Sequence, residues 1–358
     1  MKKITFPGRL ILVFACLGPF FSIRLAGQED KIAEWIKWVK KYSPSPQAKE
    51  LMLQFSLPAE NLKNDENYLW RPQQFSFDDK GNVFILDNKA KRLFKFNFKG
   101  DLIKKAGREG QGPGEFQNPY CFCMNEKALF ISDTNKREIL IFDKDLAYKN
   151  SFKTTSSYMN IAISKNGLLI AVPFRVMRES HLVDVLDESG KLLYSFADGL
   201  YGNKTHWIIN NFVFIDVNEK DEVLLAYWHY PTVCKYDIKG KLLAKYEINN
   251  ELMNSAKKQN NSSLSDPENR MYYRAMWGFH AKARGFFILL SVPYTRLLEF
   301  DESGKPIGDY WTARSFDYSA VDFAVKNGVF FILSEAPNAQ VDVFKPKDSL
   351  SGSSQKQK

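Results

Sequence analysis

Histidine and cysteine are scarce in this sequence, which contains four of each. Neither a CxxC pair nor the His–Cys spacing of a zinc site occurs. The HExxH, GxSxG, Walker and dinucleotide-binding motifs are also missing. We therefore predict no metal site and no cofactor. Cys121, Cys123 and Cys234 are expected as buried thiols, with one disulfide among them as the alternative in an oxidising compartment.

Long apolar runs are lacking as well. The longest, Leu10–Ile23, is interrupted by Gly18-Pro19 and is too short and broken for a good membrane span. It follows a basic N-terminus and precedes small residues near Gly27, which predicts a signal peptide over residues 1–27 and a secreted or periplasmic protein. The alternatives are a retained anchor and a lipoprotein attached at Cys16, and either would bring membrane association.

A large excess of one charge is also absent. The formal net charge is +9, and four of the basic residues fall within residues 1–27. The balance left after a signal peptide is removed is only mildly basic, which does not favour nucleic acid as a partner. The predicted export signal also disfavours nucleic acid as a partner, so we predict no nucleic-acid binding.

Aromatic residues are abundant at 15% of the chain, which favours strands over helices. From residue 51 onward one unit recurs six times: a turn, an apolar strand, a loop, a second strand and a turn. The first strands of these units begin at Gly81, Lys127, Gly167, Glu222, Gly285 and Gly328. The units recur at intervals of roughly 40 to 60 residues, and a four-stranded propeller blade needs about forty.

We therefore predict an all-β fold: a six-bladed β-propeller of four-stranded antiparallel blades over residues 51–345, with a solenoid as the alternative. The last unit supplies only three strands, so an N-terminal strand, Leu51–Leu57, is expected to add the fourth and close the ring without a free edge. Outside the ring we expect an N-terminal helix and linker over residues 28–50, with the helix at Asp30–Tyr42, and a polar disordered tail over residues 346–358.

Two segments resemble the NHL repeat. They are Phe84–Asp87, followed by Arg92, and Phe130–Asp133, followed by Arg137. The glycine-rich joint between them, Gly107–Pro119, is similar to the blade linker of secreted bacterial six-bladed propellers of the NHL-repeat and TolB-like class. The resemblance implies this fold and admits scaffolds, binders, lyases and lactonases as functions. The two Asp–Arg combinations are expected as structural pairs that pin adjacent loops.

The long connections all fall on one face of the predicted ring. If the strands of a blade are called a to d from the channel outward, these connections are the b–c and d–a loops, whereas the a–b and c–d turns are short. Loops on rigid scaffolds often carry binding sites. The candidate ligand-binding residues on this face are Arg175, His206, Trp207, Trp228, His229, Tyr230, Tyr273, Arg274, Trp277 and Tyr294. Aromatic faces beside arginine suit sugar rings or peptides, and the alternative for each residue is packing of a loop onto the rim.

The longest insertion, Asn249–Trp277, is expected to have two halves. Its polar first half, Ser255–Ser265, is predicted to be mobile. The pattern Ser265–Glu268 is typical of a helix N-terminus, and the helix would extend through Arg274. We expect this helix to act as a lid over the central pocket.

These patterns favour an extracytoplasmic ligand- or partner-binding scaffold, expected to be a monomer, with a protein, peptide or glycan as its ligand. A metal-dependent hydrolase or lyase of the lactonase-like type is the alternative. Such an enzyme would place inward acids and an asparagine around a divalent cation such as Ca²⁺. Asn160, Asn211 and Asp317 lie near the starts of innermost strands, but they do not make a complete ligand set.

Overall fold

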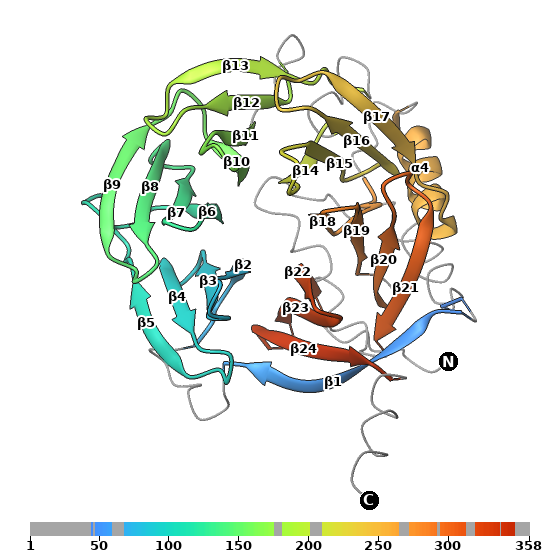
Figure 1. Cartoon of the computed structure of the whole chain (residues 1–358), viewed down its shortest axis with the longest axis horizontal. Helices are drawn as coiled ribbons and strands as arrows, with labels where there is room; N and C mark the ends of the chain where they lie inside the picture. The colour runs from blue at the N-terminus through green and yellow to red at the C-terminus, as the bar shows by residue number, and fades with distance from the viewer. Residues whose placement is uncertain are drawn as a thin grey trace, which may run out of the picture.

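The structure is a computed structural model in which the strands surround a central axis as a ring of blades (Figure 1). It describes residues 44–45, 47–58, 68–174, 181–200, 210–264, 272–291, 294–312, 319–336 and 338–347. The predicted signal peptide and N-terminal helix, and nearly all of the predicted tail, lie outside the described residues. In the described part of the chain, no helix has the length and apolar character needed to cross a membrane.

Four blades are separate four-stranded antiparallel sheets whose strands follow one another in chain order. Their strands are β2 (Pro72–Phe77), β3 (Val83–Asp87), β4 (Arg92–Phe96) and β5 (Leu102–Ala106); β6 (Pro119–Met124), β7 (Ala128–Asp133), β8 (Glu138–Asp143) and β9 (Tyr148–Lys153); β10 (Tyr158–Ile163), β11 (Leu169–Pro173), β12 (Val183–Leu186) and β13 (Leu192–Phe196); and β14 (Val213–Val217), β15 (Val223–Tyr227), β16 (Thr232–Tyr236) and β17 (Leu242–Glu247). The first strand of each sheet is the innermost and the last is the outermost (Figure 1).

The last two blades share one eight-stranded sheet. Its strands are β18 (Gly278–Lys282), β19 (Gly285–Leu290), β20 (Thr295–Phe300) and β21 (Pro306–Thr312) in one half, and β22 (Ser319–Lys326), β23 (Val329–Ala336), β24 (Gln340–Pro346) and β1 (Lys49–Leu57) in the other. The halves meet where Lys49 and Glu50 of β1 pair in parallel with β21. The rest of β1 runs antiparallel to β24, so the N-terminal strand is the outermost strand of the sixth blade.

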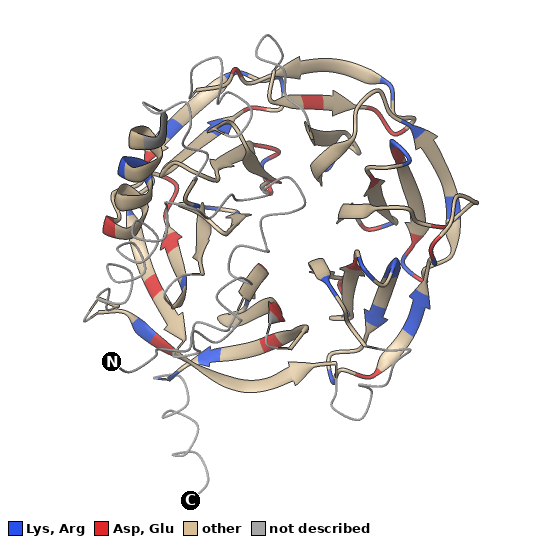
Figure 2. Ribbon diagram, turned by 180° about the vertical axis from the view of Figure 1, so that it is seen from behind, with Lys and Arg blue, Asp and Glu red and all other residues tan. Residues whose placement is uncertain are grey.

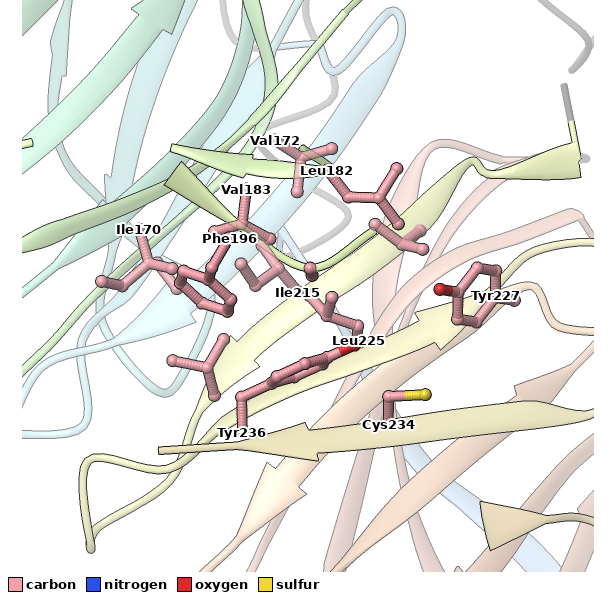
Figure 3. Close-up of a cluster of buried hydrophobic side chains, with 14 of the residues drawn as sticks. Ile170, Val172, Leu182, Val183, Phe196, Ile215, Leu225, Tyr227, Cys234 and Tyr236 are labelled. Carbon is pink, nitrogen blue, oxygen red and sulfur yellow. The ribbon is translucent and has the colours of Figure 1, made fainter. Parts of the chain in front are cut away.

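The core lies between neighbouring blades because the faces of their sheets pack together. One buried cluster joins Val172, Val183 and Phe196 of the third blade to Ile215 and Leu225 of the fourth (Figure 3). The second strands β3, β7, β11 and β15 are almost wholly buried, which explains their mainly apolar sequences. Lys, Arg, Asp and Glu are interspersed around the ring rather than gathered by sign (Figure 2).

The connections on one face of the ring are short, tight turns. In four c–d turns the first Asp accepts two backbone N–H groups of its own turn at 2.9–3.0 Å; these residues are Asp143, Asp187, Asp237 and Asp301. Gly240 closes one of these turns with φ 87°. A Cβ atom there would lie 2.5 Å from Phe196 of the preceding blade, so the glycine also permits a close blade-to-blade contact.

Asp87 and Asp133 do pin loops, but not through their arginines. The carboxylate of Asp133 accepts the backbone N–H groups of Gln117, Asn118 and Lys136. Asp87 does the same for Trp70, Arg71 and Ala90, and Arg92 instead donates to the Gly107 carbonyl. The predicted Asp–Arg pairing is therefore wrong. A buried carboxylate can satisfy several loop amides at once, whereas a guanidinium would satisfy none of them.

The expected mobile segment after Ser255 is part of a helix, α4 (Glu251–Leu264), so that prediction is wrong. Asn250 caps it, because its Oδ1 accepts the N–H groups of Leu252 and Met253 at 3.1 and 3.3 Å. Met253 and Ala256 are buried in the core between the fourth and fifth blades. The helix expected from Ser265 falls mostly outside the described residues, and residues 272–274 are not helical.

Leu57 provides a test of the ring closure. It belongs to β1 and is 0% exposed in the core between the sixth and first blades, whereas Leu53 of the same strand is 42% exposed. Leu57→Ala should lower the free energy of unfolding by about 3 kcal/mol, and Leu53→Ala by less than about 1 kcal/mol. Urea unfolding of both variants measures this, and equal losses would contradict the packing of β1 in the ring.

Candidate binding site at the mouth of the ring

On the face with the long connections, the innermost strands begin and the second strands end. Seven side chains at these strand ends form what we call the mouth: Arg71 before β2, Tyr120 in β6, Phe174 after β11, Phe212 before β14, Trp228 after β15, and Arg274 and Trp277 before β18. All seven are partly buried and partly accessible to solvent. The mouth is therefore formed by side chains from five blades.

Arg274 lies against two tryptophans. The guanidinium carbon is 4.0 Å from the ring centroid of Trp228 and 5.2 Å from that of Trp277. Both separations are within the range of a cation–π attraction. The segment that carries Arg274 is fixed, because the N–H groups of Ala275 and Met276 donate to the Trp228 carbonyl at 2.7 and 3.1 Å. Arg274 is therefore a positioned charge rather than a free surface arginine.

Aromatic contacts continue from Trp228 along the mouth. Its ring centroid is 5.3 Å from that of Phe212 and 5.2 Å from that of Phe214. Tyr120 and Phe174 form a second pair, with centroids 5.7 Å apart and planes nearly perpendicular. Trp228 is thus held by its neighbours and by Arg274, which leaves little of its face for a ligand.

A second arginine, Arg71, lies at the mouth on the first blade. Arg71 Nε lies 3.4 Å from Oε1 of Glu335, which belongs to β23 of the sixth blade. Burial raises the pKa of Tyr120, while the charges of Arg274 and Arg71 act to lower it. The Tyr120 hydroxyl is therefore within electrostatic reach of both guanidinium groups.

Asn260 of α4 holds two segments that lead into the mouth, at His229 and at Tyr273. Its Nδ2 donates to the carbonyls of His229 and Tyr273 at 2.8 and 2.9 Å, and its Oδ1 accepts the Tyr273 N–H at 2.8 Å. His229 is 3% exposed, and burial lowers the pKa of His229 to about 4. Its neutral ring must carry the proton on Nδ1, since it donates to the Tyr273 carbonyl at 3.2 Å.

A second group of polar side chains lies farther along the innermost strands, at Asp216, His280 and Asp322. His280 of β18 donates from Nδ1 to Asp216 of β14 at 2.6 Å, and Asp216 also accepts the Ala281 N–H at 2.8 Å. The side chain of His280 is 46% exposed. Asp322 of β22 accepts the Phe75 N–H of β2 at 3.0 Å. These carboxylates bridge one innermost strand to the next, where the free edge of each strand needs acceptors.

The environment of this group shifts two pKa values upward. Burial raises the pKa of Asp322 to about 7 against the opposing hydrogen bonds of Phe75 and Phe323. Burial opposes the charged form of His280, but the charge and hydrogen bond of Asp216, with the charge of Asp322, raise the pKa of His280 overall. In the described part of the chain, no cluster of His, Cys, Asp or Glu side chains could hold a metal ion.

The comparison with protein families agrees with this architecture. The model of the DUF5128 family, described as a 6-bladed beta-propeller, matches residues 63–276, more than half of the chain. The chain belongs to the DUF5128 family. The six-bladed all-β fold predicted from the repeats is confirmed. The comparison with curated proteins gave no match.

Several solved structures share the fold of this DUF5128 propeller. A Bacteroides fragilis protein described as exported has a TM-score of 0.60 and 13% identity, covering 85% of this chain and 97% of that chain. A DUF4221 family member from Bacteroides vulgatus has a TM-score of 0.58 and 12% identity, covering 84% and 98%. Virginiamycin B lyase from Staphylococcus aureus has a TM-score of 0.53 and 12% identity, covering 83% and 99%. At these identities the likeness shows the fold alone.

The structure brings together only part of the set of residues predicted from the sequence of this DUF5128 protein. Trp228, Arg274 and Trp277 meet at the mouth, with Tyr273 beside them. His229 and Tyr230 are 3% and 1% exposed and act in packing. Tyr294 lies apart, 5.9 Å from the ring of Trp311 on the outermost strand β21. Arg175, His206 and Trp207 lie outside the described residues.

Sequence reasoning missed Arg71, Tyr120, Phe174 and Phe212. Each stands within two residues of the start of an innermost strand or the end of a second strand, so alignment of the six units by strand end could have found them. Asp216, His280 and Asp322 were missed too, because they lie on the innermost strands of three different blades, which only the packing of the blades around the ring brings together.

The side chains considered for a lactonase-like site do not form one. Asn211 is 1% exposed, and its Oδ1 accepts the Leu200 N–H at 2.8 Å. Asp317 lies outside the described residues, which leaves Asn160 alone on β10. The thiols of Cys121 and Cys234 are buried, as predicted, and that of Cys123 is partly buried; all three are free.

Asp322 provides a pH test. The pKa of Asp322 is about 7 in the folded protein, above its usual 3.8, so the folded state binds this proton more tightly. Its contribution to stability is therefore full below the unfolded-state pKa and is lost as pH rises through the folded-state pKa. Asp322→Asn keeps an acceptor for the Phe75 N–H and removes the titration. From about pH 5 to about pH 8, the Tm of the unmodified protein should fall by a few degrees more than that of the variant.

Asp79 is the matched control for this measurement, because its side chain is 88% exposed. Asp79→Asn should leave the Tm–pH curve parallel to that of the unmodified protein. Parallel curves for Asp322→Asn as well would contradict the raised pKa of Asp322.

Proposed function

We propose that this DUF5128 propeller is an extracytoplasmic binding protein that holds a protein, peptide or glycan ligand at the mouth. The observation that carries the proposal is Arg274, held against Trp228 and Trp277 at the opening of the channel. Ordered arginine and aromatic side chains dominate binding energy at many interfaces because they lose little freedom when a partner docks. The signal-peptide pattern of residues 1–27 and a neighbour described as exported support the location.

The fold alone does not assign a function to this chain. The solved structures that share the fold include a lyase and a protein described as exported. Membership of the NHL-repeat or TolB-like class, suggested by the Asp87 and Asp133 units, stays a prediction and would not by itself assign a ligand.

Acid–base catalysis of the hydrolase or lyase type is the second candidate, and His280 is the observation that favours it. Asp216 orients the imidazole through Nδ1, and the ring is 46% exposed, so Nε2 could exchange a proton with a substrate in the channel. Virginiamycin B lyase shows that one enzyme has this fold. The mouth remains the first candidate because it gathers more side chains on the loop-bearing face.

The binding proposal predicts a loss of affinity from changes at the mouth alone. Arg274→Gln combined with Trp277→Leu should weaken binding of any glycan or peptide selected on an array by at least about tenfold. The matched control is Lys239→Gln combined with Lys241→Gln, two exposed lysines in the c–d turn on the opposite face. Unchanged affinity in the mouth variant, or an equal loss in the control, would place the binding surface elsewhere.

A further inference from the structure

We propose that the ligand is a glycan and that one of its sugar rings stacks on Trp70, an exposed tryptophan of the first blade that adjoins the mouth residue Arg71 in the chain. Tyr68 and Lys89 flank the Trp70 ring, and we call these three side chains the platform. The inference rests on the proposed binding function and selects one of the ligand classes given there. No side chain of the mouth is part of the platform.

Trp70 stands out by its exposure. It is 49% exposed, whereas Leu69 before it is 1% exposed and packs in the core between the sixth and first blades. The other tryptophans that the structure describes are partly buried. Single exposed apolar side chains are common on protein surfaces, so exposure alone assigns no role to Trp70. What holds the tryptophan in place, and what surrounds it, are more informative.

The buried carboxylate of Asp87 fixes the backbone on both sides of the platform. It accepts the N–H groups of Trp70 at 2.6 Å and Arg71 at 3.0 Å, in the segment before β2. It also accepts the N–H of Ala90 at 2.8 Å, in the connection between β3 and β4 that carries Lys89. Because the two segments share one buried acceptor, the platform is ordered before a ligand arrives and loses little freedom on binding.

The second blade has the same arrangement without an aromatic side chain. There the buried carboxylate of Asp133 accepts the N–H of Gln117 at 2.7 Å, as Asp87 accepts that of Trp70. Phe116, the residue before Gln117, is 0% exposed and takes the buried place that precedes Trp70 in the first blade. The backbone is therefore held equally well with a glutamine at this position. The fold does not require the Trp70 ring, which indicates that the ring serves a ligand.

The groups around the Trp70 ring suit a sugar. The ring of Tyr68 meets it at 81° with centroids 5.6 Å apart, and Lys89 Nζ lies 4.8 Å from its centroid. Within the described residues, the Tyr68 hydroxyl makes no hydrogen bond and Lys89 makes no ion pair. A sugar ring has an apolar C–H face that packs on an aromatic ring, and hydroxyl groups at its edge that need donors and acceptors.

Lys89 does not block the platform. It is exposed, and its long flexible stem lets the ammonium group move from the Trp70 ring to a sugar hydroxyl. Trp70 would then supply the flat apolar surface, and Tyr68 and Lys89 would supply the polar contacts that select among sugars.

The polar surroundings of Trp70 favour a glycan over a protein or peptide. The other exposed large apolar side chains that the structure describes in the first blade are Phe98, in the c–d turn, and Ile103 of β5. Neither lies in the two segments held by Asp87. A tryptophan at the centre of a protein interface is ringed by contacts that exclude water. A stacked sugar, in contrast, leaves the edge of the tryptophan in water.

Native affinity electrophoresis of the full-length mature protein tests the ligand class. Each gel contains one uncharged polysaccharide: amylopectin, xyloglucan, galactomannan or α-mannan. At least one of them should retard the protein relative to a gel without polysaccharide. The retardation should persist when salt is added, because stacking on an aromatic ring does not depend on ion pairing.

Three variants locate the interaction. Trp70→Gln introduces the residue that the second blade carries at this place, so it should keep the Tm and weaken retention at least about tenfold. Tyr68→Phe keeps the ring contact and removes only the hydroxyl, and it should weaken retention about threefold. Gln117→Ala in the second blade is the matched control and should change neither the Tm nor the retention.

The outcomes separate the platform from the mouth. Retention that Trp70→Gln leaves unchanged would overturn the platform. Retention lost in Trp70→Gln but kept in the mouth variant, Arg274→Gln with Trp277→Leu, would support the platform and contradict the mouth as the principal site. Absence of retention on every polysaccharide would overturn the glycan, and a peptide whose binding the mouth variant abolishes would then leave the proposed function intact.

Discussion

The antiparallel pairing of β1 with β24 is the contact on which the rest of the ring depends. Without it the sixth blade would have three strands and an unpaired outer edge. Polar contacts as well as the apolar core join the sixth blade to the first: Arg71 reaches Glu335 at 3.4 Å, and the Phe75 N–H donates to Asp322 at 3.0 Å. One side of the mouth and one side of the channel are therefore assembled only when the two ends of the domain meet.

The two faces of the ring differ in how their connections satisfy the backbone. On one face, tight Asx turns such as that of Asp237 satisfy their own backbone amides and leave little surface for a ligand. On the other face, buried side chains satisfy the backbone of the longer connections. Asp133 accepts the N–H groups of Gln117 and Asn118, and Asn260 accepts the Tyr273 N–H. The side chains that remain exposed at the mouth are held by this framework, which is what a selective binding site requires.

Much of the fold could be predicted from the sequence because each blade repeats a local pattern. Apolar second strands and Asp- or Gly-containing turns mark the units from Gly81 to Gly328, and the incomplete last unit calls for an extra strand. The site was less predictable because its contacts join blades far apart in the chain. Arg71 with Glu335 is one example, and Asp216 with His280 is another. His229 and Tyr230 look like binding residues in the sequence but are buried. His229 lies beside α4, where Asn260 donates to its carbonyl, and Tyr230 packs in the core between the third and fourth blades. The cap of α4 at Asn250 was overlooked.

A crystallographic soak with a mixed fragment library would show whether the mouth binds ligands, because it reports where small molecules bind without assuming a ligand class. We expect density at the mouth, beside Arg274 and Trp277, for several unrelated fragments. Density confined to the surroundings of His280 would favour the catalytic candidate. Density confined to the face of the short turns, with an empty mouth, would show that the mouth is not the binding site.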